Sequence, residues 1–213
     1  MHDVLEAILS DMDGVLVDSE TLGISIAVEV CSTYGIDLTD DEKQSFIGVS
    51  DDVFYTKLFQ SRGVDFDPME ALTKHTALYE ERLPNAKGFK ESVEFITIAR
   101  GLFKLALISG STRKQVDVVL KSIGLEGVFE VIISCDDVEN GKPNPEGYLR
   151  AAAELGVDPS RCVVLEDAEK GVRAAKAAGM FCIGIRNGNE KQDLSLADIR
   201  IKTLFPELID SLL

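Results

Sequence analysis

Five short apolar runs recur along the chain, each about the length of one strand. They are rich in Val, Ile and Leu and do not alternate cleanly with polar residues, which is the pattern of strands buried on both faces. The runs are VLEAILS (4–10), LFKLALIS (102–109), VFEVIIS (128–134), CVVLED (162–167) and MFCIGIR (180–186). This pattern predicts a parallel sheet rather than an antiparallel sheet with one face exposed to solvent.

Helical patterns lie between these runs. The apolar spacing predicts helices over 89–99, 113–123, 145–155 and 169–178. Strands that alternate with helices favour an α/β fold in which helices cover both faces of a parallel sheet. We therefore expect a Rossmann-like α/β core.

The segment from about residue 19 to 84 breaks this rhythm, because it contains no convincing strand. Three amphipathic helices are predicted at 21–35, 51–63 and 68–83. The acidic stretch DLTDDEK (37–43) predicts an exposed helix start with Thr39 or Asp40 as N-cap. We expect a helical cap over 18–85 inserted into an α/β core formed by 1–17 and 86–213.

Composition limits the partners. The chain of 213 residues is 45% hydrophobic and carries a net charge of −15, so nucleic acid and anionic membranes are not expected partners. No apolar stretch reaches the length of a membrane span, and the first residues do not predict a signal peptide. A cytoplasmic monomer is the expectation. His75 is expected at the surface, and the cysteines are expected as buried free thiols: Cys31, Cys135, Cys162 and Cys182.

Polar residues collect where the predicted strands end. In an open parallel sheet, ligands bind outside the carboxyl ends of the strands, so these side chains should meet at one edge. They are Asp11 and Asp13 after the first strand, Ser109–Thr112 after the second, Lys142 after the third, and Glu166 and Asp167 after the fourth.

Such a set suits phosphoryl transfer. Asp11, Asp13 and Asp167 offer the hard oxygen ligands that Mg²⁺ prefers. The Ser109 hydroxyl, the Gly110 amide and Lys142 could hold anionic oxygens. The chain lacks an EF-hand loop, a Walker A loop and a GxGxxG fingerprint, and it has no Trp to stack on sugars as a glycosidase would.

The same residues resemble the four motifs of the haloacid dehalogenase (HAD) superfamily, in its phosphatase branch with a helical cap after the first strand. The matching segments are DMDGVLVDSE, LALISGS, the lysine of GKPNPEGY, and LEDAEKGVRAAKAAGM. The resemblance covers essentially the whole chain. It implies an α/β core with a cap and a Mg²⁺-dependent phosphatase.

The resemblance also implies roles. Asp11 would be the nucleophile that forms an aspartyl-phosphate, and Asp13 the general acid and base, with its carbonyl on Mg²⁺. Asp167 would bind the metal, with Glu166 as a further ligand or its supporting partner. The residues implied in phosphate and substrate binding are Ser109, Gly110, Ser111, Lys142 and Asn144, with Glu20, Thr21, Gly48, Val49 and Ser50 from the cap.

Some positions depart from the family pattern. Ala168 replaces a common serine in the fourth motif, which leaves Asp167 in place. A β-phosphoglucomutase-type isomerase is the alternative, but Ile47 and Asp51 stand where that enzyme has basic cap residues. Gly23 also replaces its histidine. We favour hydrolysis of a small phosphate ester, a sugar or polyol phosphate, over this isomerase and over a non-catalytic binding protein.

Overall fold

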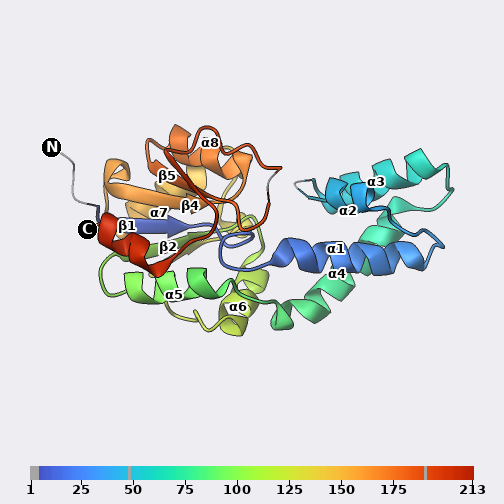
Figure 1. Cartoon of the computed structure of the whole chain (residues 1–213), viewed down its shortest axis with the longest axis horizontal. Helices are drawn as coiled ribbons and strands as arrows, with labels where there is room; N and C mark the ends of the chain where they lie inside the picture. Colours follow the sequence, from blue (N-terminus) through green and yellow to red (C-terminus); the bar gives the residue numbers. More distant parts are fainter. Residues whose placement is uncertain (1–4, 48, 190) are drawn as a thin grey trace. The chain divides into compact units, whose positions relative to one another are not determined.

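The computed structural model describes residues 5–47, 49–189 and 191–213. The chain forms two compact units, one made of residues 19–86 and the other of the residues up to Asp18 and from Lys87 onward (Figure 1). The predicted insert, 18–85, begins and ends one residue earlier than this helical unit. The two connections leave the larger unit side by side, because the Asp18 N–H donates to the Lys87 carbonyl at 3.0 Å.

The larger unit is built on a sheet of six parallel strands in the order β3-β2-β1-β4-β5-β6, so the expected α/β fold is confirmed. The strands are β1 (Ala7–Ser10), β2 (Lys104–Ile108), β3 (Val131–Ile133), β4 (Cys162–Glu166), β5 (Phe181–Ile185) and β6 (Ile199–Ile201). Ser10 pairs with Leu107 on one side and Leu165 on the other. The three central strands therefore end at the same level, and the polar residues that follow them come together.

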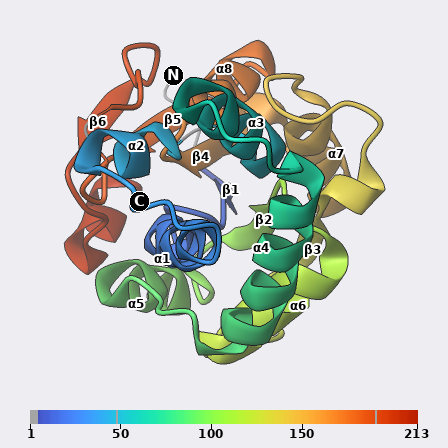
Figure 2. The same cartoon turned by 90° about the vertical axis from the view of Figure 1, so that its right-hand side faces the viewer.

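Helices cover both faces of this sheet (Figure 2). They are α5 (Lys90–Ala99), α6 (Arg113–Ser122), α7 (Glu146–Leu155) and α8 (Glu169–Ala177). α7 and α8 share one face, where Leu9 and Val164 pack against small helix residues such as Ala151 and Ala175. Helices α5 and α6 lie on the other face (Figure 2), as the usual right-handed connection between parallel strands would place them.

Two features of the larger unit differ from the sequence predictions. β6 was not predicted, because its three residues, IRI, form a half-exposed edge strand with no apolar run. Cys135 is exposed, in the short 3₁₀-helix η2 (Cys135–Asp137) after β3, so the expectation of a buried thiol was wrong there. The other three cysteines are buried and free.

The helical unit consists of α1 (Ser19–Ser32), α2 (Asp40–Ser45), α3 (Asp51–Arg62) and α4 (Pro68–Arg82), followed by η1 (Leu83–Asn85). Thr39 is the N-cap of α2, where it forms a capping box with Glu42. α4 packs against α1 and α3 around an aromatic core that includes Phe54 and Phe59. None of the described helices is long and apolar enough to cross a membrane.

His75 lies inside the helical unit, so its expected surface position was wrong. It is 1% exposed, and its Nδ1 lies 2.8 Å from the Tyr55 hydroxyl. Its ring stacks near Phe46 and Tyr79, with centroids 5.5 and 6.4 Å away. No local pattern predicts this burial, because Phe46 and Tyr55 come from two other places in the chain and Tyr79 from the next turn of α4.

Candidate active site

Asp11 and Asp13 stand in the loop that follows β1. The Asp11 N–H donates to the Leu165 carbonyl at 2.9 Å, so the backbone of this residue is fixed between β1 and β4. Its side chain is 9% exposed. Gly14 then turns the chain with φ +75°, a conformation that costs little only for glycine.

The side chain of Asp13 is held by the loop after β2. Its Oδ2 accepts a hydrogen bond from the Ser111 hydroxyl at 3.1 Å and a longer one from the Ser109 hydroxyl at 3.3 Å. The Ser109 Oγ also accepts the Ser111 N–H at 3.0 Å. The carboxylate from one strand end and the hydroxyls from the next are therefore in contact. Gly110 lies exposed between the two serines.

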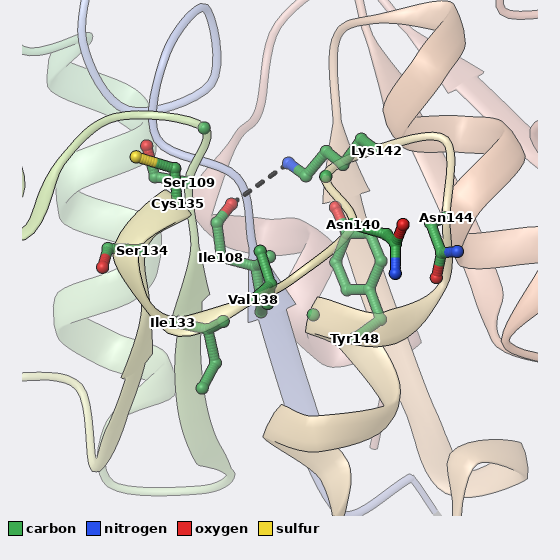
Figure 3. A pocket seen from close by; sticks show the side chains of 13 residues that line it. Ile108, Ser109, Ile133, Ser134, Cys135, Val138, Asn140, Lys142, Asn144 and Tyr148 are labelled. Carbon is green, nitrogen blue, oxygen red and sulfur yellow. Dashed lines mark hydrogen bonds between the residues drawn. The ribbon is translucent and has the colours of Figure 1, made fainter.

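Lys142 joins the third strand end to this cluster. Its ammonium donates to the Asp11 Oδ1, to the Glu166 Oε1 at 2.6 Å and to the Ile108 carbonyl at 3.1 Å; Figure 3 shows the last of these bonds. An ammonium has three N–H donors, so all are used. Lys142 thus points its charge at the carboxylate predicted to be the nucleophile.

Glu166, at the end of β4, is 1% exposed. Its Oε1 accepts hydrogen bonds from Lys142 and from the Tyr148 hydroxyl, each at 2.6 Å. Its Oε2 accepts the N–H groups of Asp167 at 3.1 Å and Ala168 at 3.3 Å. Space for this carboxylate depends on Gly171, because a Cβ there would lie 1.8 Å from Oε1.

A divalent cation fits the donor set. One carboxylate oxygen from each of Asp11, Glu166 and Asp167 lies within 4.8 Å of the others, and all three residues are buried. Asp13 brings a fourth carboxyl group to this edge of the sheet, and the Lys142 ammonium contacts two of the four, Asp11 and Glu166. Buried like charges need a proton or a cation between them, and oxygen donors suit Mg²⁺.

The charges also shift two pKa values. Burial raises the pKa of the Asp11 carboxyl; Lys142 opposes this, while Glu166 and Asp13 reinforce it. Burial acts to lower the pKa of the Lys142 ammonium, but Asp11 and Glu166 outweigh it and raise that pKa. The raised pKa favours the charged form of Lys142, and a further cation beside Asp11 would favour the ionised carboxylate that a nucleophile requires.

Asn187 is a residue that the sequence analysis missed. It follows β5, and its side-chain amide donates to the Gly14 carbonyl at 2.8 Å and more weakly to the Val15 carbonyl at 3.4 Å. Its φ is +43°, a region that asparagine tolerates better than most residues. The sequence did contain a signal for Asn187, because it is a polar residue just after a predicted strand. The other candidate site residues were chosen for the same reason.

The remaining predicted site residues are placed less directly. Asn144 lines a mostly apolar pocket beside Lys142 with Ser109 and Gly110 (Figure 3). Its Oδ1 accepts the Glu146 N–H at 3.0 Å, which supports the start of α7. Glu20 belongs to the first turn of α1 in the helical unit, so its role at the site stays a prediction. Gly48 lies outside the described residues.

Comparisons with known proteins agree with this arrangement. Residues 8–185 match the haloacid dehalogenase-like hydrolase family. A phosphorylated carbohydrates phosphatase of Thermotoga maritima is 34% identical over 83% of this chain and 82% of its own length. The protein SUPPRESSOR OF QUENCHING 1, chloroplastic, of Arabidopsis thaliana is 36% identical over 96% of this chain, which spans only 19% of that protein.

A solved structure shows the same fold. The HAD family hydrolase of Deinococcus radiodurans, with bound phosphate and sodium, superposes with a TM-score of 0.83 and 28% identity, over 98% of this chain and 95% of that one. The parallel sheet and its carboxylate–lysine cluster define an α/β protein whose polar site lies at the carboxyl ends of the strands. The chain belongs to the haloacid dehalogenase-like hydrolase family. Relatives named as phosphatases support a phosphoric monoester hydrolase.

Proposed function

We propose that this chain is a Mg²⁺-dependent phosphatase that hydrolyses a sugar or polyol phosphate through an aspartyl-phosphate on Asp11. The observation that carries the proposal is the contact of the Lys142 ammonium with the Asp11 carboxylate, in one cluster with Glu166 and Asp167. The relative named as a phosphorylated carbohydrates phosphatase supports the substrate class.

In the first step, a carboxylate oxygen of Asp11 attacks phosphorus as the bond from phosphorus to the ester oxygen breaks. Lys142 stabilises the phosphoryl oxygens, together with the Ser109 hydroxyl and the Gly110 amide. Protonated Asp13 gives its proton to the leaving oxygen, so an alcohol departs. The Ser109 and Ser111 hydroxyls on its Oδ2 support Asp13 in this orientation.

In the second step, water hydrolyses the aspartyl-phosphate. Asp13, now ionised, accepts a proton from the water as the water oxygen attacks phosphorus. The bond between phosphorus and Asp11 breaks, which releases inorganic phosphate and restores both carboxyl groups.

The metal would be held by the carboxylates of Asp11 and Asp167 and by the Asp13 carbonyl, with Glu166 beside them. When bound, Mg²⁺ supplies positive charge that neutralises the phosphoryl oxygens. The helical unit would exclude water and select the substrate; Glu20 and Gly48 are the predicted contributors, together with Thr21, Val49 and Ser50.

The test is release of inorganic phosphate from a panel of phosphorylated sugars, polyols, nucleotides and 2-phosphoglycolate, with Mg²⁺ and with a chelator. We expect turnover of sugar or polyol phosphates that the chelator abolishes and added Mg²⁺ restores. Folded protein that releases phosphate from none of these compounds would contradict the proposal. Undiminished turnover in the chelator would contradict the metal requirement alone.

The isomerase alternative predicts a different result. Asp51, where the mutase resemblance implies a basic residue, lies 3.7 Å from the buried His75 and brings negative charge to that part of the cap. We therefore expect no conversion of β-glucose 1-phosphate to glucose 6-phosphate, even with a sugar bisphosphate as activator. Conversion that depends on the bisphosphate would instead identify an isomerase.

A further inference from the structure

We infer that Tyr148 is a positioning residue for the phosphate-binding lysine: its hydroxyl fixes Glu166, and Glu166 fixes Lys142 against Asp11. This inference rests on the proposed phosphatase function. It assigns a role to a side chain that the sequence motifs leave unassigned.

Tyr148 projects from the first turn of α7 and is 0% exposed. Its hydroxyl donates to the Glu166 Oε1 at 2.6 Å. The Lys142 Nζ lies 5.3 Å from the centre of the Tyr148 ring, and Figure 3 shows the two side chains next to each other. The same tyrosine therefore contacts the lysine by its ring and the partner of the lysine by its hydroxyl.

The hydrogen bonds at Glu166 form a closed set. A carboxylate has about four acceptor positions, and here Tyr148, Lys142 and the backbone N–H groups of Asp167 and Ala168 occupy four. The lysine has no spare donor either, because its third bond goes to the Ile108 carbonyl. In a buried network of this kind, the loss of one member releases the orientation of its neighbours.

The two oxygens of Glu166 serve different halves of the site. Oε1 faces Lys142 and Tyr148, whereas Oε2 holds the backbone at Asp167, the predicted metal ligand. Removal of the Tyr148 hydroxyl takes a donor from Oε1 and leaves both bonds of Oε2 in place. Loss of the Tyr148 hydroxyl should therefore change the position of Lys142, which is proposed to bind the phosphoryl group, more than the position of the metal ligand Asp167.

The test compares Tyr148→Phe with Tyr55→Phe. Both substitutions keep a buried ring and remove one buried hydroxyl hydrogen bond, but Tyr55 bonds to His75 in the helical unit. Thermal melting would show that both variants fold and would measure the loss of stability that they share. The probes are p-nitrophenyl phosphate for turnover and inorganic phosphate for inhibition and for direct binding by calorimetry.

For Tyr148→Phe we expect kcat to fall about tenfold and the inhibition constant of inorganic phosphate to rise about five- to tenfold, as for loss of a hydrogen bond to a charged group. The Mg²⁺ concentration for half-maximal rate should stay within about twofold of the wild-type value, since the metal ligands are untouched. Tyr55→Phe should leave all three quantities within about twofold.

Unchanged kcat and phosphate affinity in Tyr148→Phe would overturn the inference. A matching rise in the Mg²⁺ requirement would also overturn it, because that result indicates general disruption of the site. A wild-type protein that turns over no phosphate ester would refute the proposed function instead. Calorimetry with inorganic phosphate would still compare the two variants in that case.

Discussion

At the scale of single residues, the site depends on carboxylates that lie close to glycines, and Gly14 is one of these glycines. A Cβ on Gly14 would lie 2.0 Å from the Asp167 Oδ2. Real atoms do not come that close, so any side chain at position 14 must displace the carboxylate proposed to bind the metal. Gly14 thus serves both the turn after β1 and the position of Asp167.

We predict that Gly14→Ala lowers kcat/KM about a hundredfold and weakens Mg²⁺ binding, because a displacement of about 1 Å at a reacting site has that effect. Gly124→Ala is the matched control. Gly124 has φ +76°, against +75° for Gly14, but nothing lies within 4 Å of its Cβ position. Both variants should lose similar stability on melting, and only Gly14→Ala should lose activity. Equal activity in the two would refute this role of Gly14.

Which site residues could be predicted from the sequence depends on what fixes them. Asp11, Asp13, Lys142 and Glu166 follow strand ends, and parallel strands bring those ends together. Hydrogen bonds between side chains and distant parts of the chain, in contrast, could not be predicted from the sequence. The bond from Asn187 to the Gly14 carbonyl spans 173 positions, and no periodicity encodes it.

At the scale of elements, the sequence predicts helices and strands best where burial produces a long run or a regular spacing of apolar residues. The four helices of the core and strands β1 to β5 fall within the predicted runs, and α3 and α4 fall within the helices predicted at 51–63 and 68–83. Helix α1 begins two residues before the helix predicted at 21–35 and ends three residues before its predicted end. β6 was not predicted, because an edge strand of three residues has no such apolar pattern. The burial of His75 was missed because helix α4 has a weakly apolar inner face, with Ala71 and His75 as its fully buried residues.

His75 gives the helical unit a pH dependence. Burial lowers the pKa of its imidazole, and the Asp51 carboxylate opposes this. The folded protein therefore keeps His75 neutral at pH values where the unfolded chain, with a pKa of about 6.5, binds a proton. The free energy of unfolding must then fall as the pH drops below about 6.5.

We predict that the melting temperature of the wild-type protein falls more steeply between pH of about 7.5 and 5.5 than that of His75→Gln, which cannot bind this proton. Thermal melts followed by circular dichroism at matched ionic strength provide the measurement. The comparison concerns the slope with pH, so an overall loss of stability in His75→Gln does not affect it. Equal slopes for the two proteins would contradict the account of a neutral, buried His75.

At the scale of the whole molecule, the larger unit supplies every group in the proposed chemical steps. Asp11, Asp13, Ser109, Lys142 and Asp167 all belong to the larger of the two units. The helical unit is inserted into the larger unit between Asp18 and Lys87, whose backbones are hydrogen-bonded to each other. Chemistry and proposed substrate choice are thus carried by separate parts of the chain, and the substrate itself could not be predicted from the sequence.

The central claim is that Asp11 carries the phosphoryl group, and the most direct test is to trap that group. Asp13→Asn should still allow attack on an ester whose leaving group needs no proton, such as p-nitrophenyl phosphate. It should also slow the hydrolysis that follows, because the base is missing. Acid quenching and peptide mapping after reaction with ³²P-labelled ester would then locate the phosphate.

We predict a burst of about one equivalent of nitrophenol per enzyme, as expected when a covalent intermediate accumulates. The label should lie on the peptide that contains Asp11, should be removed by hydroxylamine, and should be absent from the Asp11→Asn variant. Label on another residue, or turnover that persists in folded Asp11→Asn, would contradict the account.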